Sequence, residues 1–314
     1  MADMNFGNLN EDVQIPAKET YANDTFVTPE PTSSEIGDNG LSLEEINDAN
    51  KIKVEIADYK APLVILFGPP SCGKTMTLVR LARYLHDKPG YTVKPDTSFR
   101  PSYDKRYKDM CDNFDAMISD DEAAKSTDKI NFMLVKVLYQ GKTLCQILEG
   151  PGEYYFKPED PKAKFPKYVN AIINSQNRKI WAIMVEPDNT NSRMNSVARS
   201  NYVAKIRNLK TKLNYRDKIL FVFNKIDETD FVIAPGKIKY NLALQHTNFL
   251  YPSIFAPFKN VNPITKLWKP NNFDFVAFHT GDYSETADGS KTFEKGHDVY
   301  PMKLWEIISK RIRG

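Results

Sequence analysis

Residues 62–75 read Pro62-Leu-Val-Ile-Leu-Phe-Gly-Pro-Pro-Ser-Cys-Gly-Lys-Thr75, and this stretch decides the fold. Its first six residues form a wholly apolar run, which is typical of a strand buried on both faces. Its last eight residues, Gly68 to Thr75, match the phosphate-loop pattern GxxxxGK[ST]. Residues 75–86 then space their apolar side chains as a helix does. Strand, glycine-bearing loop and helix follow one another as the pattern requires, so we predict a phosphate-binding loop.

Each part of this loop has a physical task. The glycines leave backbone N–H groups free to surround a phosphate, and the helix directs its positive end at the same anion. We expect the Lys74 ammonium to reach the β- and γ-phosphates and to act in catalysis, and the Thr75 hydroxyl to ligate Mg²⁺. Cys72 has two open interpretations, a small filler or a redox sensor. The predicted nucleotide contacts in this region are Gly68, Pro69, Pro70, Ser71, Cys72, Gly73, Lys74, Thr75 and Met76.

Strand-like and helix-like runs alternate along the rest of the chain. Two strand-like runs, residues 130–139 and 143–148, flank a Gln-Gly-Lys turn and indicate a hairpin. A short helix is expected over residues 41–49, with Ser42 as its N-cap and Glu45 completing a capping box. The other predicted strands are residues 180–185, 219–223 and 273–278, and the other predicted helices are residues 161–174, 196–213, 237–247 and 302–312. We therefore predict an α/β fold of three layers, with a mostly parallel sheet and one antiparallel edge hairpin.

Charge is unevenly divided along the 314 residues, which carry 43 Lys plus Arg and 40 Asp plus Glu. Residues 1–50 hold eleven acidic side chains and one basic one, a net −10, so residues 51–314 hold a net +13. We expect a largely flexible acidic segment over 1–50 and one domain over 51–314. Two stretches of that domain, near residues 91–129 and 251–272, have the character of insertions.

Composition excludes several classes of protein. A hydrophobic content of 41% supports a packed core. No apolar run approaches the roughly 18–20 residues that span a bilayer, so no integral membrane segment is expected. The N-terminus has no secretory signal, and three cysteines make no disulfide framework, so we expect a cytoplasmic protein. Lysines and arginines are spread rather than clustered, so nucleic-acid binding is not expected. The four histidines lack metal-ligand spacing, so zinc is not expected either.

A second motif, Asn224-Lys-Ile-Asp227, follows the predicted strand 219–223. Ligands of open α/β sheets bind at the carboxyl ends of the strands, so this position suits a base-binding loop. A carboxylate at Asp227 can accept hydrogen bonds from the N1–H and the 2-amino group of guanine, whereas adenine would leave it unpaired. We expect Asn224 to tie loops together and the stem of Lys225 to lie along the face of the base.

The phosphate-loop motif and the Asn-Lys-Ile-Asp motif together make the chain resemble the Ras-like, TRAFAC-type P-loop GTPases, as a divergent member. We suspect a relation to the double-GTPase-like proteins of bacterial conflict systems. Glu149-Gly-Pro-Gly152 is similar to the third motif of that class, DxxG. The resemblance implies that Gly152 offers its N–H to the γ-phosphate. Glu149 replaces the usual Asp as a Mg²⁺-associated acid, and Glu153 stands where relatives have the Gln that orients water.

The remaining motifs of the class are less distinct. Thr280 and Gly281 follow the last predicted strand, where the resemblance implies a loop that touches guanine, although an ordinary turn is the open alternative. Thr127 is our candidate for the threonine that clasps Mg²⁺ and the γ-phosphate, with Thr97 as its rival. Arg100 lies in the same long insertion and is a candidate arginine finger.

The resemblance implies a guanine-nucleotide switch. Such a protein binds GTP or GDP with Mg²⁺, hydrolyses GTP slowly, and changes its affinity for a protein effector, which is unidentified here. Glu149 and the absence of the Gln favour an alternative, a GTP-binding scaffold or interaction module with low turnover. A further alternative is an ATP-using P-loop enzyme.

Overall fold

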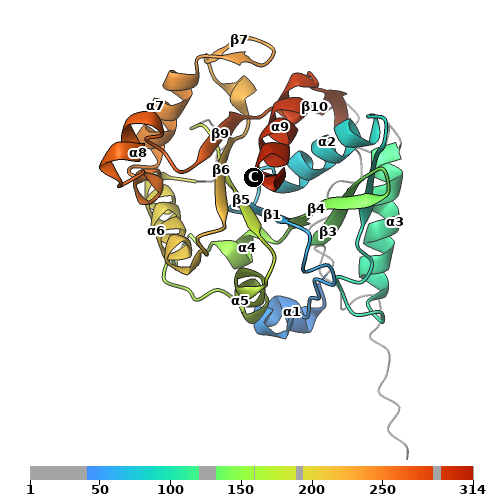
Figure 1. Cartoon of the computed structure of the whole chain (residues 1–314). Coiled ribbons are helices and arrows are strands. Elements are labelled where there is room, and N and C mark those ends of the chain that lie inside the picture. The colour runs from blue at the N-terminus through green and yellow to red at the C-terminus, as the bar shows by residue number, and fades with distance from the viewer. Residues whose placement is uncertain (1–40, 120–131, 159, 189–193, 286–290, 314) are drawn as a thin grey trace, which may run out of the picture. The chain divides into compact units, whose positions relative to one another are not determined.

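A seven-stranded sheet with the strand order β2-β3-β4-β1-β5-β6-β9 forms the centre of the structure (Figure 1). The computed structural model describes residues 41–119, 132–158, 160–188, 194–285 and 291–313. Strands β4, β1, β5, β6 and β9 run parallel, while β2 and β3 pair antiparallel with their neighbours. The strands of this sheet are β1 (Leu63–Phe67), β2 (Tyr91–Pro95), β3 (Met133–Tyr139), β4 (Lys142–Glu149), β5 (Lys179–Val185), β6 (Lys218–Phe223) and β9 (Asp274–Ala277).

Helices flank the sheet on both faces, which confirms the predicted α/β class (Figure 1). Helices α2 and α9 pack against each other, and α2 also contacts α3. The helices are α1 (Leu43–Asn47), α2 (Lys74–His86), α3 (Lys105–Ser119), α4 (Gly152–Tyr155), α5 (Lys167–Asn174), α6 (Ser196–Lys212), α7 (Tyr240–Leu250), α8 (Pro263–Trp268) and α9 (Val299–Arg313). No helix among the described residues is both long and apolar enough to cross a bilayer.

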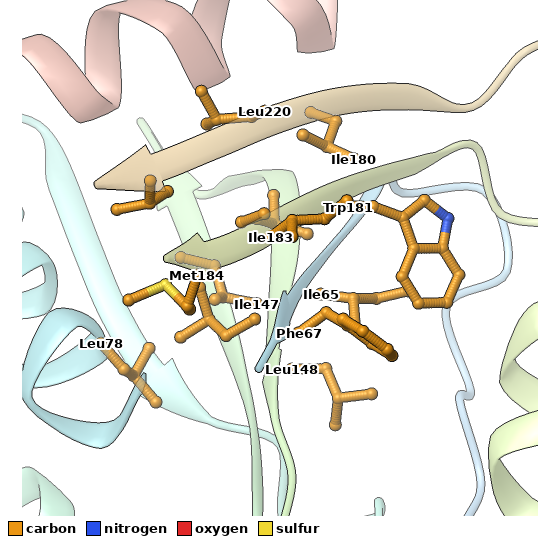
Figure 2. Packing of buried hydrophobic residues seen from close by; sticks show 14 of the residues in the cluster. Ile65, Phe67, Leu78, Ile147, Leu148, Ile180, Trp181, Ile183, Met184 and Leu220 are labelled. Atoms are coloured by element: carbon orange, nitrogen blue, oxygen red, sulfur yellow. The ribbon is translucent and has the colours of Figure 1, made fainter. Parts of the chain in front are cut away.

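The two strands β1 and β5 at the centre of the sheet are buried along their whole length, as their apolar sequences predict. Every residue of β1 and of β5 is buried. The Phe67 ring lies 5.1 Å from the ring of Tyr155, 6.0 Å from that of Trp181 and 6.2 Å from that of Tyr202. The residues labelled in Figure 2 come from β1, β4, β5, β6 and α2, so this core joins the sheet to a covering helix. It also fixes the loops at the carboxyl ends of these strands.

Most of the predicted elements are confirmed, and some of the differences fall in the expected insertions. The stretch near 91–129 contributes β2 as an additional edge strand, together with α3. β2 alternates exposed and buried residues, which is the pattern of a strand at an edge. The capping box at α1 is present: Glu45 N–H donates to Ser42 Oγ at 3.2 Å, and Ser42 N–H donates to Glu45 Oε2 at 3.1 Å.

Two small hairpins were not anticipated, and two helices begin later than predicted. The helix expected over residues 161–174 begins at Lys167, after Pro166. β7 (Val232–Ala234) pairs with β8 (Lys237–Ile238), so the helix expected from residue 237 begins only at Tyr240. β10 (Gly281–Glu285) pairs with β11 (Lys291–Lys295) directly after the last strand of the main sheet. The stretch near 251–272 holds a 3₁₀ turn at Ala256–Phe258 and the short helix α8.

Candidate functional site

The phosphate loop joins the carboxyl end of β1 to the first turn of α2. Gly73 has φ +87°, a left-handed conformation that glycine adopts without strain. A Cβ at Gly73 would lie 2.1 Å from Asn224 Nδ2, and one at Gly68 would lie 2.6 Å from Cys72 Sγ. A Cβ at Gly68 would also lie 2.9 Å from Met184 Cβ of β5, so contacts with other segments of the chain require glycine at both positions.

The two polar side chains at the start of α2 face inward. Lys74 is 5% exposed, and its Nζ donates to the carbonyl of Pro69 at 2.9 Å. The Thr75 hydroxyl donates to Glu149 Oε1 at 3.1 Å. Glu149 is the last residue of β4, which pairs with β1. Two of the three predicted metal ligands, Thr75 and Glu149, are thus in direct contact.

The Glu149 carboxyl is in an unfavourable place for a negative charge. Burial raises its pKa to about 7, while the Lys74 ammonium and the Thr75 hydrogen bond act in the opposite direction. Its Oε2 is buried and has no hydrogen-bond partner in the part of the chain that the structure describes. A divalent cation would satisfy this oxygen, and Mg²⁺ needs only one or two carboxylates when phosphate and water complete its shell. The donor set therefore fits Mg²⁺.

The loop that follows β4 packs onto the phosphate loop. A Cβ at Gly152 would lie 2.4 Å from Pro70 N and 2.7 Å from Lys74 Nζ, so only glycine allows this approach. Glu153 is half-buried and lines a neighbouring cavity of about 380 Å³, together with Lys157 and other residues. Gly152 is thus next to the predicted phosphate position, and Glu153 lies at the wall of the adjoining cavity.

The base motif is tied to the phosphate loop by a single side chain. Asn224 is 1% exposed, and its Nδ2 donates to the carbonyl of Cys72 at 3.0 Å. The backbone N–H of Asn224 donates to Val185 O at 2.9 Å, which anchors the motif to the end of β5. The missing side chain at Gly73 leaves room for the Asn224 amide. The two predicted nucleotide motifs, about 150 residues apart, therefore meet in the folded chain.

Asp227 lies at the open end of this arrangement. Its side chain is 35% exposed, and Oδ1 lies 3.5 Å from Nε2 of His279. Lys225 adopts a left-handed backbone, φ +54°, and its Nζ lies 3.0 Å from Oε2 of Glu186. Ile226 N–H donates to the carbonyl of Phe278 at 3.2 Å. The base motif is therefore held between the loops after β5 and β9.

The loop after β9 contains the predicted Thr280 and Gly281. Gly281 is buried, has φ +126°, and opens β10, so the position needs glycine. Thr280 is half-buried and directly follows His279. The loop therefore lies beside Asp227 through His279, and its contact with guanine stays a prediction.

Three residues of the insertion near 91–129 were candidates for contacts with Mg²⁺ or the phosphates, and the structure places them differently. The Arg100 guanidinium donates to Glu45 Oε1 at 2.6 Å, to Lys53 O at 2.8 Å and to Asp104 Oδ2 at 2.9 Å. None of these partners belongs to the phosphate loop, so Arg100 here holds the chain around α1. Thr97 is exposed, two residues after the end of β2. Thr127 lies outside the described residues.

Cys72 behaves as a buried filler. It is 1% exposed, and burial raises the pKa of its thiol to about 11. The thiol is therefore protonated at neutral pH, whereas redox-sensing cysteines are exposed and ionise readily.

Sequence reasoning missed two residues of the base end, Glu186 and His279. Glu186 follows the last residue of β5 by one position, and His279 follows the last residue of β9 by two. This placement could have identified them from the sequence, because side chains that follow the carboxyl ends of parallel strands come together at one edge of the sheet. Their partners, Lys225 and Asp227, come from a third strand end, and no local pattern in the sequence shows such pairings.

Comparison with known proteins gives no sequence family. No protein-family model matches the chain, and no curated protein matches it. Among solved structures, it is similar to nucleolar GTP-binding protein 1 from Plasmodium falciparum, with 13% identity and a TM-score of 0.39 over 83% of this chain and 90% of that one. It is also similar to the apo cytosolic domain of the T. maritima FeoB iron transporter, with 11% identity and a TM-score of 0.31 over 81% of this chain and 65% of that one. Similarity this low carries no argument about function, so the Ras-like subtype and the conflict-system relation stay predictions.

Proposed function

We propose that the chain binds a guanine nucleotide with Mg²⁺ and hydrolyses GTP slowly as a molecular switch. The observation that carries the proposal is the hydrogen bond from Asn224 Nδ2 to the Cys72 carbonyl at 3.0 Å. It joins a base-type motif to a phosphate-type loop across a glycine that allows the contact. One ligand that carries both a phosphate chain and a base can then bridge the two.

The phosphate end would hold the charged part of the nucleotide. Lys74 would exchange the Pro69 carbonyl for phosphate oxygens, a stronger charge-assisted contact. Mg²⁺, held by Thr75 and Glu149, would neutralise charge on the phosphates when it is bound. Because Gly152 packs against Pro70 and Lys74, a γ-phosphate beside Lys74 would compete for the same space. The segment from Glu149 to Tyr155 is therefore the part whose position would depend on that phosphate.

The base end would select guanine. The Asp227 carboxylate can accept from guanine N1–H and the 2-amino group, while Lys225 lies beside it and is held by Glu186. Thr280 and Gly281 would complete the pocket from the loop after β9. His279 contacts the same carboxylate that guanine would use, so the incoming base shares Asp227 with it or displaces it.

Slow turnover follows from the acids near the phosphate end. Glu153 would orient water with a carboxylate, which repels the γ-phosphate, where relatives use a neutral amide. Arg100 would act in catalysis only after leaving Glu45 and Asp104. The same observations favour a second candidate, a binding module with very low turnover. The effector protein and the cytoplasmic location stay predictions.

A competition experiment with a fluorescent guanosine diphosphate tests nucleotide binding. Lys74→Ala should weaken binding at least about 100-fold, since it removes the charge-assisted phosphate contact. The exposed Lys212→Ala is the matched control and should bind as the parent chain does. Equal competition by ATP and GTP would favour the ATP-using enzyme. Tight GTP binding without phosphate release over hours in single turnover would favour the low-turnover module.

The base assignment has its own test. Asp227→Asn should shift preference from guanosine towards xanthosine nucleotides, because the substitution exchanges an acceptor for a donor. The shift should be about 10-fold or more in the ratio of the two affinities. Asp230→Asn, exposed three positions further on, should leave the ratio unchanged. An unchanged ratio in Asp227→Asn would show that Asp227 does not contact the base.

A further inference from the structure

The segment from Val261 to Trp268 exposes an unusual concentration of apolar surface. Seven large apolar side chains among the described residues are exposed by 74% or more, and four of them lie in these eight positions. They are Val261 at 92%, Ile264 at 74%, Leu267 at 84% and Trp268 at 88%. Ile264, Leu267 and Trp268 are three and four residues apart in α8, so they share one side of the helix. We call these three residues, together with Val261 just before the helix, the α8 apolar face.

Only positive charge accompanies this face in the sequence. Residues 252–273 contain Lys259, Lys266 and Lys269 and no Asp or Glu. All three lysines are exposed. A cavity of about 470 Å³ adjoins the segment and is lined by Val261, by two of these lysines and by three further bases, with one acid. The three further bases are Lys210, Lys218 and Arg311, and the acid is Asp217.

We propose that the α8 apolar face and its lysines dock on a membrane surface that contains anionic phospholipids. Phosphate and carboxylate headgroups complement the lysines, while the acyl boundary accepts Ile264, Leu267 and Trp268. Tryptophan favours this interface because its ring is apolar and its N–H is polar. The inference goes beyond the proposed nucleotide function and does not depend on it.

The exposure of the face favours a lipid surface over a protein partner. Nothing in the described chain flanks these side chains closely enough to bury even one third of any of them. A partner protein would need a preformed cleft for four protruding side chains, whereas lipid headgroups rearrange around them. A partner that balanced the lysines would also need acids beside that cleft. A bilayer with anionic lipids supplies both properties without a shaped cleft.

Trp268 supplies a direct readout on the full-length chain. The protein has three tryptophans, and the other two, Trp181 and Trp305, are 0% and 7% exposed. Vesicles of phosphatidylcholine with about one third phosphatidylserine should shift the tryptophan emission to the blue, and brominated acyl chains should quench it. The chain should also sediment with these vesicles and much less with phosphatidylcholine alone. A chain that stays in the supernatant with the anionic vesicles overturns the proposal.

Variants assign the binding to α8. Leu267→Ala combined with Trp268→Ala should abolish sedimentation, while Phe249→Ala, a side chain 78% exposed on α7, should leave it unchanged. Lys266→Gln and Lys269→Gln should each weaken vesicle binding about fivefold at low salt. The thermal midpoint and the circular dichroism spectrum of each variant report on folding. Vesicle binding that survives the α8 double variant contradicts the proposal. A dimer that dissociates on the same substitution, without vesicle binding, would assign the face to a second copy.

Discussion

The phosphate end and the base end of the candidate site differ in how far they are closed. At the phosphate end, Lys74 is 5% exposed and Glu149 is 2% exposed, and the Gly152 backbone lies against the loop. At the base end, the Asp227 side chain is 35% exposed and that of Lys225 is 24% exposed. Buried polar groups must be satisfied by the fold itself, so changes at the phosphate end alter stability as well as binding. Changes at the base end should alter specificity with little effect on folding.

The largest expected effect falls at Gly73, where the two ends meet. Gly73→Ala places a Cβ 2.1 Å from Asn224 Nδ2 on a backbone with φ +87°, so the Asn224 amide must leave the Cys72 carbonyl. Overpacking and left-handed strain together cost about 3 kcal/mol, which corresponds to roughly 100-fold in nucleotide affinity. Titration with fluorescent guanosine diphosphate measures this loss.

Gly141→Ala is the matched control for that experiment. Gly141 also has a left-handed backbone, φ +78°, but a Cβ there meets nothing within 4 Å. It therefore carries the backbone strain without the clash, and nucleotide affinity should stay at the parent value. Equal losses in both variants would mean that strain, and not the contact with Asn224, accounts for the effect.

The second prediction concerns the pH dependence of stability at the phosphate end. Glu149 has a folded-state pKa of about 7, above its usual value of 4.5. The native state therefore holds this proton more tightly than the unfolded state, and stability falls as pH rises from about 4.5 through about 7. The loss amounts to at most about 3 kcal/mol in metal-free protein. Urea unfolding with a chelator present, from pH 5 to pH 8, measures this decline.

Substitution isolates the contribution of Glu149 from other titrating groups. Glu149→Gln stays neutral and can still accept from Thr75, so the decline should be smaller and the variant more stable than the parent at pH 8. The exposed Glu306→Gln should follow the parent curve. Parallel curves for the parent and Glu149→Gln would contradict the raised pKa. Mg²⁺ with nucleotide should reduce the decline, because a bound cation favours the ionised carboxylate.

The two ends also differ in how much the sequence could predict. The residues of the phosphate loop are contiguous in the sequence, and they are flanked by an apolar strand pattern and by a helical spacing of apolar residues. The sequence alone therefore predicted the loop and the α/β fold. The contact between Thr75 and Glu149 needed the strand order, which the resemblance implied. The pairs Lys225–Glu186 and Asp227–His279 join separate strand ends, and local patterns carry no such information. β2 was missed because an edge strand that alternates polar and apolar residues over five positions resembles a loop.

The smallest expected effect on guanine-nucleotide affinity is at Glu186, and it tests how far the base end is open to solvent. Glu186→Gln removes one charge of the ion pair that holds Lys225 beside Asp227. The Glu186 side chain is 6% exposed and that of Lys225 is 24% exposed. An ion pair with one member open to water contributes about 1 kcal/mol, so guanine-nucleotide affinity should fall roughly fivefold. Lys225→Met keeps the aliphatic stem and should give a similar loss. Calorimetric titration of both variants measures these losses.

A double variant tests whether Glu186 affects nucleotide binding only through Lys225. If Glu186 acts through Lys225, Glu186→Gln in the Lys225→Met background should cause little further loss of guanine-nucleotide affinity. If the two residues act independently, the two losses of binding free energy should add. As a control, Asp188 lies in the same loop after β5 and forms an ion pair with Arg199 of α6. Asp188→Asn breaks that ion pair and should leave guanine-nucleotide affinity unchanged. The unfolding free energy of Glu186→Gln should lie within about 1 kcal/mol of the parent, because the amide keeps the shape of the buried Glu186 side chain and the charge that remains, that of Lys225, is 24% exposed. A larger loss of stability would mean that the base end is as closely packed as the phosphate end.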